Sequence, residues 1–351
     1  MEKAVAGLVL ITITLSGIVS TSAYSDYVKE EKPKIAVINS TIKILLNEII
    51  GDYFEILTIL PDGVDPHSFS LTPELVQALS DCELIVLIDP NFFGLEASII
   101  SNDQLSNKPY LFSENYSIFG WRYISIPSIQ TNFHGSWLDL NNSLSIVKSV
   151  VNYLIFKHPS LATYLSQKLA LFENLIEHYN SLIRNISKLH DLSKYNVLIA
   201  IPGVAYIVNM LGVSIKDVLF TEPGSFPSAS RIAEIKQKLD TREYNLIIAP
   251  YEMKNKRVGQ LVDELSAETG VPVVYIYIFQ VGEFSSYLDF IMYDVYKIAF
   301  ESKVEKGAKG DSVFEEIYLF YFIALLSSII VIESYVIFRY KRMEFKAFEE
   351  A

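Results

Sequence analysis

The chain has 351 residues, a formal net charge of −12 and a hydrophobic fraction of 50%. This balance offers no basic surface to a nucleic acid, because the only basic cluster follows an apolar segment near the C-terminus. A single cysteine, Cys82, excludes an internal disulfide and a cysteine-based zinc cluster.

The N-terminal segment has the pattern of an export signal. Residues 1–23 are apolar from Ala4 to Val19 and end in Ser20-Thr21-Ser22-Ala23, small residues of the kind that signal peptidase cuts after. An uncut N-terminal membrane anchor is the alternative. We therefore expect export, with the signal peptide at residues 1–23.

In the first part of the body, apolar strands alternate with helices. Strands are expected at Lys34–Ile38, Phe54–Leu60 and Leu84–Asp89, each apolar on both faces, as in a covered parallel sheet. Helices are expected at Thr41–Ile50 and after Thr72, an N-cap residue that precedes a proline. This order predicts an α/β lobe at residues 33–140.

A second α/β lobe is expected at residues 193–300. Its predicted strands are Asn196–Ile201, Val218–Thr221, Leu246–Ala249 and Val271–Ile278. Its predicted helices are Ala205–Leu211, Ser230–Leu239 and Arg257–Thr269. The fold class is therefore α/β, with two mainly parallel sheets covered by helices.

Between the two lobes, residues 141–192 contain one long helix, at about Pro159–Leu189. Apolar residues follow spacings of four and three along it and form one stripe: Leu165, Leu169, Phe172, Ile176, Tyr179, Ile183 and Ile186. A dimer seam is the alternative to packing within the chain. We expect the helix to pack on both lobes and the body to be monomeric.

The C-terminal part predicts one membrane span. Ile317–Phe338 has 22 residues and one charge, Glu333, and roughly 33 Å of helix matches a hydrocarbon core of about 30 Å. Basic residues follow and mark the cytoplasmic side: Arg339, Lys341, Arg342 and Lys346. We predict a linker at 301–316, a transmembrane helix at 317–338, a cytoplasmic tail at 339–351, and a body outside the membrane.

Two of the five histidines lie in loops where a ligand is expected. His67 follows a predicted strand, and open α/β sheets bind ligands at the carboxyl ends of their strands. His134 lies in a loop between the first lobe and the long helix. Neutral imidazole is a natural ligand for zinc or manganese. His158, His178 and His190 are interpreted as surface or cap residues.

The sequence contains no pattern typical of an enzyme. A Gly-x-Ser-x-Gly nucleophile motif is absent, and so are a glycine-rich phosphate loop and a dinucleotide-binding glycine pattern. We therefore expect a binding protein without a catalytic cofactor.

Two segments carry a resemblance to a known family. Leu60–Glu74 (LPDGVDPHSFSLTPE) closely resembles the histidine loop of the zinc- and manganese-binding solute-binding proteins of ABC importers, the cluster A-I type. Asn132–Asp139 resembles their second histidine loop, with one extra residue. The long helix and the late strands also fit that family. The resemblance covers roughly residues 33–300.

The resemblance implies a metal site in the cleft between the lobes, but only half of its ligand set is present. His67 and His134 match the first two ligands. Ile201 stands where the family has a His or Glu, and Tyr277 stands at its Asp. Because zinc sites use about four ligands, water, Tyr277 or Glu222 would have to complete the set.

The resemblance therefore favours an extracytoplasmic solute-binding protein. It would capture Zn²⁺ or Mn²⁺ as transported ligand and deliver the ion to an ABC permease in the same membrane. The alternative is a degenerate relative that has lost high-affinity metal binding and serves as a surface adhesion or interaction protein. Isoleucine at position 201, which has no donor atom, and the aromatic Tyr277 favour this alternative.

Overall fold

The computed structural model describes residues 32–62, 64, 69–221, 225–279 and 284–302. The predicted signal peptide at 1–23 and the predicted span at 317–338 lie outside these residues. Within the described ranges, no helix is both long and apolar enough to cross a membrane.

The first lobe is built on a parallel sheet whose strand order is β2-β1-β3-β4. Its strands are β1 (Lys34–Val37), β2 (Glu55–Thr58), β3 (Cys82–Val86) and β4 (Tyr110–Leu111). Its helices are α2 (Ser40–Ile50), α3 (Pro73–Ser80), α4 (Gly94–Ile100) and α5 (Ser113–Ser117). Thr72 caps α3 as predicted, because its hydroxyl accepts the backbone N–H of Leu75.

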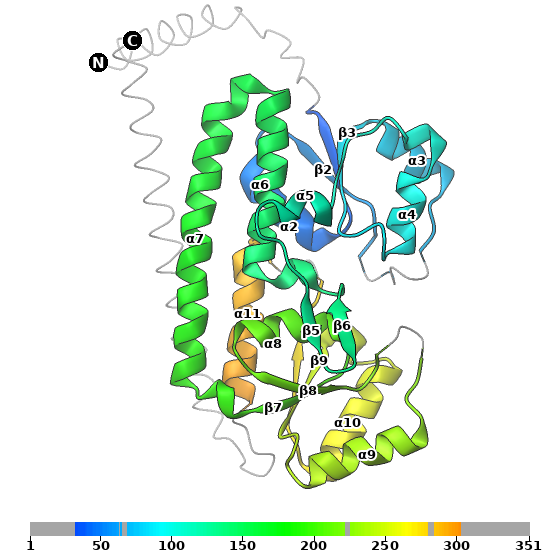
Figure 1. Cartoon of the computed structure of the whole chain (residues 1–351), viewed down its shortest axis with the longest axis vertical. Coiled ribbons are helices and arrows are strands. Elements are labelled where there is room, and N and C mark those ends of the chain that lie inside the picture. Colours follow the sequence, from blue (N-terminus) through cyan, green and yellow to red (C-terminus); the bar gives the residue numbers. More distant parts are fainter. Residues whose placement is uncertain (1–31, 63, 65–68, 222–224, 280–283, 303–351) are drawn as a thin grey trace, which may run out of the picture.

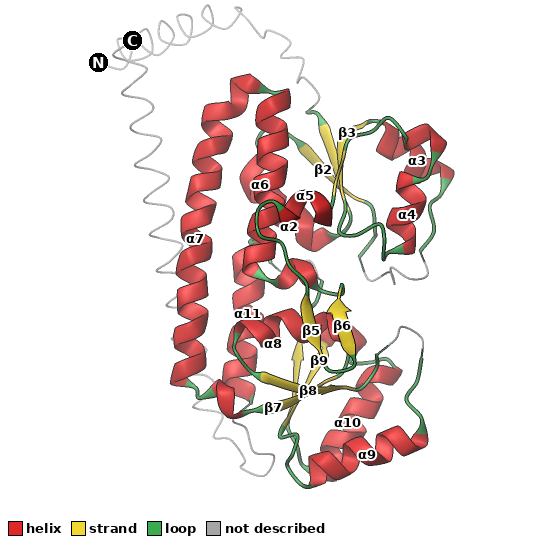
Figure 2. Cartoon of the chain, in the orientation of Figure 1, coloured by secondary structure: helices red, strands yellow, loops and turns green. Residues whose placement is uncertain are grey.

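The second lobe repeats this plan with the strand order β10-β9-β7-β8, again all parallel. Its strands are β7 (Asn196–Ile199), β8 (Ser214–Val218), β9 (Leu246–Pro250) and β10 (Val273–Ile276). Its helices are α8 (Ala205–Met210), α9 (Ala229–Asp240), α10 (Arg257–Thr269) and α11 (Tyr287–Glu301). Two parallel sheets covered by helices confirm the predicted α/β class (Figure 2).

Strand β8 differs from its predicted position. We expected a strand at Val218–Thr221, but β8 begins at Ser214 and ends at Val218. Its charged Asp217 is buried, because the carboxylate pairs with the guanidinium of Arg231 and accepts the hydroxyl of Tyr244 at 2.9 Å. These partners lie 14 and 27 residues further along the chain, so a local apolar run does not reveal the strand.

The segment between the lobes forms two helices, α6 (Leu140–Lys157) and α7 (Ala162–Leu189), which pack on each other. Figure 1 shows α7 running along the side of the body. Its apolar stripe faces inward, and Leu165, Phe172, Ile176, Ile183 and Ile186 are buried. The stripe therefore packs within the chain.

A small antiparallel hairpin, β5 (Ile124–Ile126) and β6 (Ile129–Asn132), precedes the second histidine loop. The buried hydroxyl of Tyr206, on α8, joins its two strands. It accepts the backbone N–H of Ile124 and donates to the carbonyl of Asn132. The second lobe thereby fixes the loop that carries His134.

Candidate metal site between the two lobes

Beside His134, the backbones of the two lobes come into contact. Gly135 has φ +74°, a left-handed conformation that favours glycine. A Cβ atom at Gly135 would lie only 2.1 Å from the carbonyl oxygen of Gly203 in the second lobe. We call this contact zone, made by Asn132, Gly135 and Trp137 against Gly203 and Ile278, the interlobe seam.

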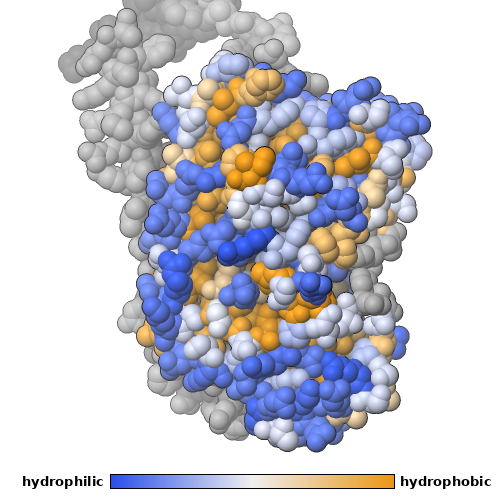
Figure 3. All heavy atoms as spheres, viewed as in Figure 1, coloured by the Kyte–Doolittle hydropathy of each residue, from blue (hydrophilic) through white to orange (hydrophobic). Residues whose placement is uncertain are grey.

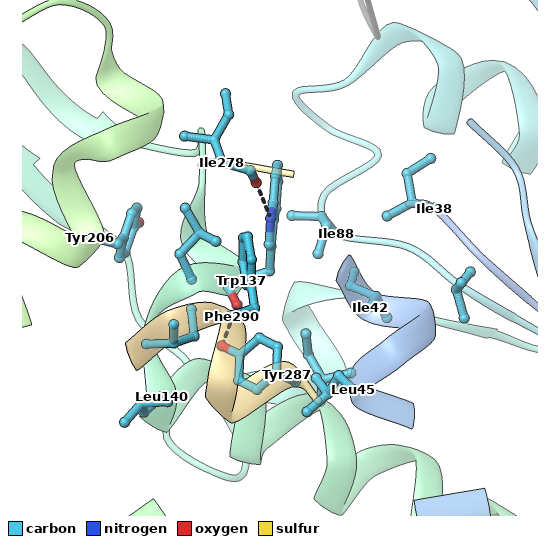
Figure 4. Packing of buried hydrophobic residues seen from close by; sticks show 14 of the residues in the cluster. Ile38, Ile42, Leu45, Ile88, Trp137, Leu140, Tyr206, Ile278, Tyr287 and Phe290 are labelled. Carbon is cyan, nitrogen blue, oxygen red and sulfur yellow. Dashed lines mark hydrogen bonds between the residues drawn. The ribbon is translucent and has the colours of Figure 1, made fainter. Parts of the chain in front are cut away.

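Hydrogen bonds reinforce the interlobe seam on both sides of the glycine. The side-chain amide of Asn132 donates to the carbonyl of Pro202 at 3.0 Å, and the indole N–H of Trp137 donates to the carbonyl of Ile278 at 3.4 Å. The hydroxyl of Tyr287, on α11, donates to the carbonyl of Trp137 at 2.8 Å (Figure 4). Each side of the His134 loop is therefore tied to the second lobe.

His134 lies between this seam and a wall of aromatic side chains. Its backbone N–H donates to the Asn132 side chain at 3.1 Å. The rings of Phe92 and Phe93 stand perpendicular to the imidazole, with centroids 5.1 and 6.0 Å away. Phe92 also stacks on Phe133 at 4.3 Å. Apolar rings that limit water around an imidazole would strengthen its interaction with a bound cation.

Two buried acids hold the turn that carries this aromatic wall. The carboxylate of Asp89 accepts the hydroxyls of Tyr123 (2.6 Å) and Ser113 (3.0 Å). Glu96 accepts the backbone N–H groups of Ile88 (2.9 Å) and Asp89 (2.7 Å). Burial raises the pKa of Glu96 to about 8. Sequence spacing did not reveal this support, since its members lie on separate elements.

Ile201 approaches the same region from the second lobe. It follows β7 and precedes the short 3-10 helix η5 (Pro202–Val204). Its Cδ1 atom would lie 3.6 Å from a Cβ placed on Gly203, the residue that contacts Gly135. Ile201 therefore lies beside Gly203 on the second-lobe side of the interlobe seam, and His134 precedes Gly135 on the other side. An aliphatic side chain stands where the resemblance implies a ligand.

Tyr277 follows β10 and is buried among aromatic rings. Tyr251, Tyr293 and Phe284 lie 4.8, 5.8 and 6.0 Å from it, measured between ring centroids. The backbone N–H of Tyr277 donates to Asp294 at 3.0 Å. Burial raises the pKa of Asp294 well above its ordinary value. The next residue, Ile278, thus belongs to the interlobe seam. The ring of Tyr277 itself packs inside the second lobe.

The structure describes the three other histidines, whereas the candidate ligands His67 and Glu222 lie outside the described residues. His158 pairs with Glu83 at 2.8 Å, His190 ends α7, and His178 is exposed on that helix. In the described part of the chain, no group of three or more His, Cys, Asp or Glu side chains is placed to hold a metal ion.

Comparison with known proteins now identifies the family. A family model described as ZnuA, zinc-uptake complex component A, periplasmic, matches residues 35–299. This is most of the chain and includes both sheets and the interlobe seam. The chain belongs to this family. The expected membership in the zinc- and manganese-binding solute-binding protein family is thereby confirmed.

Curated relatives and solved structures agree with this family. The manganese ABC transporter substrate-binding lipoprotein PsaA of Streptococcus pneumoniae is 26% identical over 181 residues. That alignment covers 49% of this chain and 57% of PsaA, so it spans little more than half of that relative. Family members of this kind are substrate-binding proteins, which agrees with the expected non-enzymatic role.

Two solved structures share the fold. The crystal structure of ZnuA matches with a TM-score of 0.64 and 18% identity, covering 78% of this chain and all of ZnuA. A mutant of the laminin-binding adhesin Lmb of Streptococcus agalactiae matches with a TM-score of 0.63 and 16% identity, covering 77% and 99%. At this identity the likeness shows the fold.

Proposed function

We propose that the chain is the substrate-binding component of an ABC importer, which captures Zn²⁺ or Mn²⁺ at the interlobe seam and delivers it to a permease. The observation that carries the proposal is the position of His134, held against the second lobe by the contact between Gly135 and Gly203. Family membership and the manganese-binding relative support the class of ligand.

In this proposal the first lobe supplies both imidazoles, from His67 and His134. A closed zinc site has about four ligands. Water or Glu222 fills the remaining positions, because the ring of Tyr277 packs among aromatic rings inside the second lobe. Because Ile201 contributes no donor atom, the affinity is lower than that of a site with a full set of protein ligands. Weaker binding suits a carrier that must release its ion to a partner.

A gain of metal affinity tests this arrangement. In Ile201→Glu a carboxylate replaces the apolar side chain that borders the seam, and we expect zinc to bind about tenfold tighter, a change of about 1.4 kcal/mol. Ile232→Glu is the matched control, because Ile232 is also a partly buried isoleucine of the second lobe but lies on α9. Competition with a fluorescent zinc chelator measures both affinities. Equal affinity in Ile201→Glu and the wild type would contradict the proposed geometry.

The body is proposed to work outside the membrane, near its permease. Residues 1–23 would direct export and residues 317–338 would anchor the chain, leaving lobes at 33–140 and 193–300 joined by residues 141–192. An anchor in the membrane that holds the permease raises the effective concentration of the two partners. The linker at 301–316 sets how far the body can move from its anchor.

A second candidate is an adhesion or interaction protein that keeps the fold without tight metal binding. The apolar Ile201 favours it, since an aliphatic side chain is a poor neighbour for an ion whose ligand set is incomplete. The solved Lmb structure, titled a laminin-binding adhesin, shares the fold. This candidate predicts that metal does not bind at micromolar concentration.

A further inference from the structure

Two large apolar side chains are exposed together at the end of the body where α7 and α11 finish. Leu189, the last residue of α7, is 78% exposed, and Phe300, in the last turn of α11, is 44% exposed. The ring of His190, the next residue after Leu189, lies 4.8 Å from the ring of Phe300. We call Leu189 and Phe300 the apolar tip. Single exposed apolar residues are common, so the position of the tip matters more than its size.

Basic side chains flank the apolar tip. Lys188 and Lys194 are exposed, whereas Tyr195, whose ring centroid lies 5.6 Å from the Lys194 ammonium, is buried. Lysine stems beside exposed apolar and aromatic residues are typical of surfaces that meet lipid headgroups. Asp191 is exposed at the same end, and Glu301 lies 3.7 Å from Lys297. Because this charge is mixed, the apolar side chains must supply most of any contact.

The chain leaves the described body at this same end. The carbonyl of Ser302 accepts the Tyr195 hydroxyl at 3.2 Å. Fourteen residues, 303–316, separate Ser302 from the apolar segment that begins at Ile317. A chain of that length reaches at most roughly 50 Å from end to end. Phe300 of the apolar tip is thus close to the proposed anchor along the chain, and Leu189 lies at the same end of the body.

The opposite end of the body is a long way from this exit. Helix α7 has 28 residues, and a helix of that length measures about 42 Å. Phe156, which is 81% exposed, lies near the end of α6, just before the turn into α7. To stand the body on the end that carries Phe156, residues 303–316 would have to be stretched close to their full length. That extension costs chain entropy, whereas contact through the apolar tip does not.

We propose that the apolar tip rests on the outer lipid surface of the membrane, so that the body stands on the end of its second lobe. This inference rests on the C-terminal anchor proposed above. Burying apolar area in the headgroup region stabilises the contact. The tether alone would hold the body near the membrane; the tip would also fix which end faces it.

Two labelled variants of the full chain test the proposal. Leu189→Cys and Phe156→Cys each carry a polarity-sensitive dye, and the protein is reconstituted into vesicles of phosphatidylethanolamine and phosphatidylglycerol. Native Cys82 is fully buried, and burial raises the pKa of its thiol to about 11, so labelling selects the new cysteine. We expect the dye at position 189 to shift to shorter wavelength and to be quenched by spin-labelled lipid. The dye at position 156 should keep its emission in water.

Flotation of the vesicles separates failure of the tip from failure of the anchor. Protein that floats with the vesicles while the dye at 189 stays unshifted overturns the apolar tip and leaves the anchor standing. A shift at 156 in place of 189 overturns it as well. Protein that does not float overturns both the anchor and the tip, and metal binding measured on the same sample shows whether the proposed ligand survives.

Discussion

Gly135→Ala is expected to destabilise the protein by about 3 kcal/mol or more and to abolish metal binding. Two costs combine in this variant. A residue with a side chain pays about 1–2 kcal/mol for a left-handed backbone such as the φ of +74° here. The added Cβ would also lie 2.1 Å from the Gly203 carbonyl oxygen, so the lobes must separate or the loop must move. Urea unfolding measures the loss of stability.

Gly212→Ala is the matched control for the backbone cost. Gly212 has φ +65°, but a Cβ placed there meets no atom within 4 Å. We expect this control to lose only about 1 kcal/mol and to keep its metal affinity. Equal losses in the two variants would show that the contact between Gly135 and Gly203 contributes nothing beyond its backbone conformation.

Glu96→Gln is expected to remove a large pH dependence of stability. Glu96 is buried, and its pKa rises from 4.5 to about 8 in the folded chain. Between these two values the folded state holds a proton that the unfolded state has released. The free energy of unfolding therefore falls as pH rises, by about 1.4 kcal/mol per pH unit and by roughly 4 kcal/mol between pH 5 and 8. Below pH 4.5 this contribution is fully present.

The glutamine variant keeps the acceptor oxygen for the N–H groups of Ile88 and Asp89 but has no proton to lose. Its stability should change less than the wild type's between pH 5 and 8 in urea unfolding. Glu264→Gln, at an exposed glutamate of α10, is the control and should keep the wild-type profile. A wild-type profile in Glu96→Gln would mean that another group carries the dependence.

Local signals in the sequence predicted several elements closely. Helix α10 was predicted at its observed bounds, Arg257–Thr269, because Gly270 adopts the left-handed conformation that ends a helix. The hairpin of β5 and β6 was not predicted. Its turn includes Ser128 at φ +65°, and serine lacks the glycine or asparagine signal of such a turn. Turns held by long-range contacts leave little local trace.

Some features of the candidate site were likewise predicted from local sequence, and others were not. His134 was predicted to be a metal ligand from its loop position and from the resemblance of Asn132–Asp139 to the family's second histidine loop, and this role stays a prediction. Phe92 and Phe93 were not predicted, because phenylalanine is abundant here, with 21 residues, and most of it serves the core. The close approach of Gly135 to Gly203 depends on how two lobes pack, which no local pattern encodes.

Calorimetric titration of the full chain in detergent with zinc and with manganese tests the central claim most directly. Wild type should bind one ion per chain at micromolar or tighter affinity, and His134→Ala should weaken binding at least about tenfold. His178→Ala, at an exposed histidine of α7, should match the wild type. Absence of binding at micromolar metal, or equal affinity in His134→Ala and wild type, would contradict a metal receptor built on this seam.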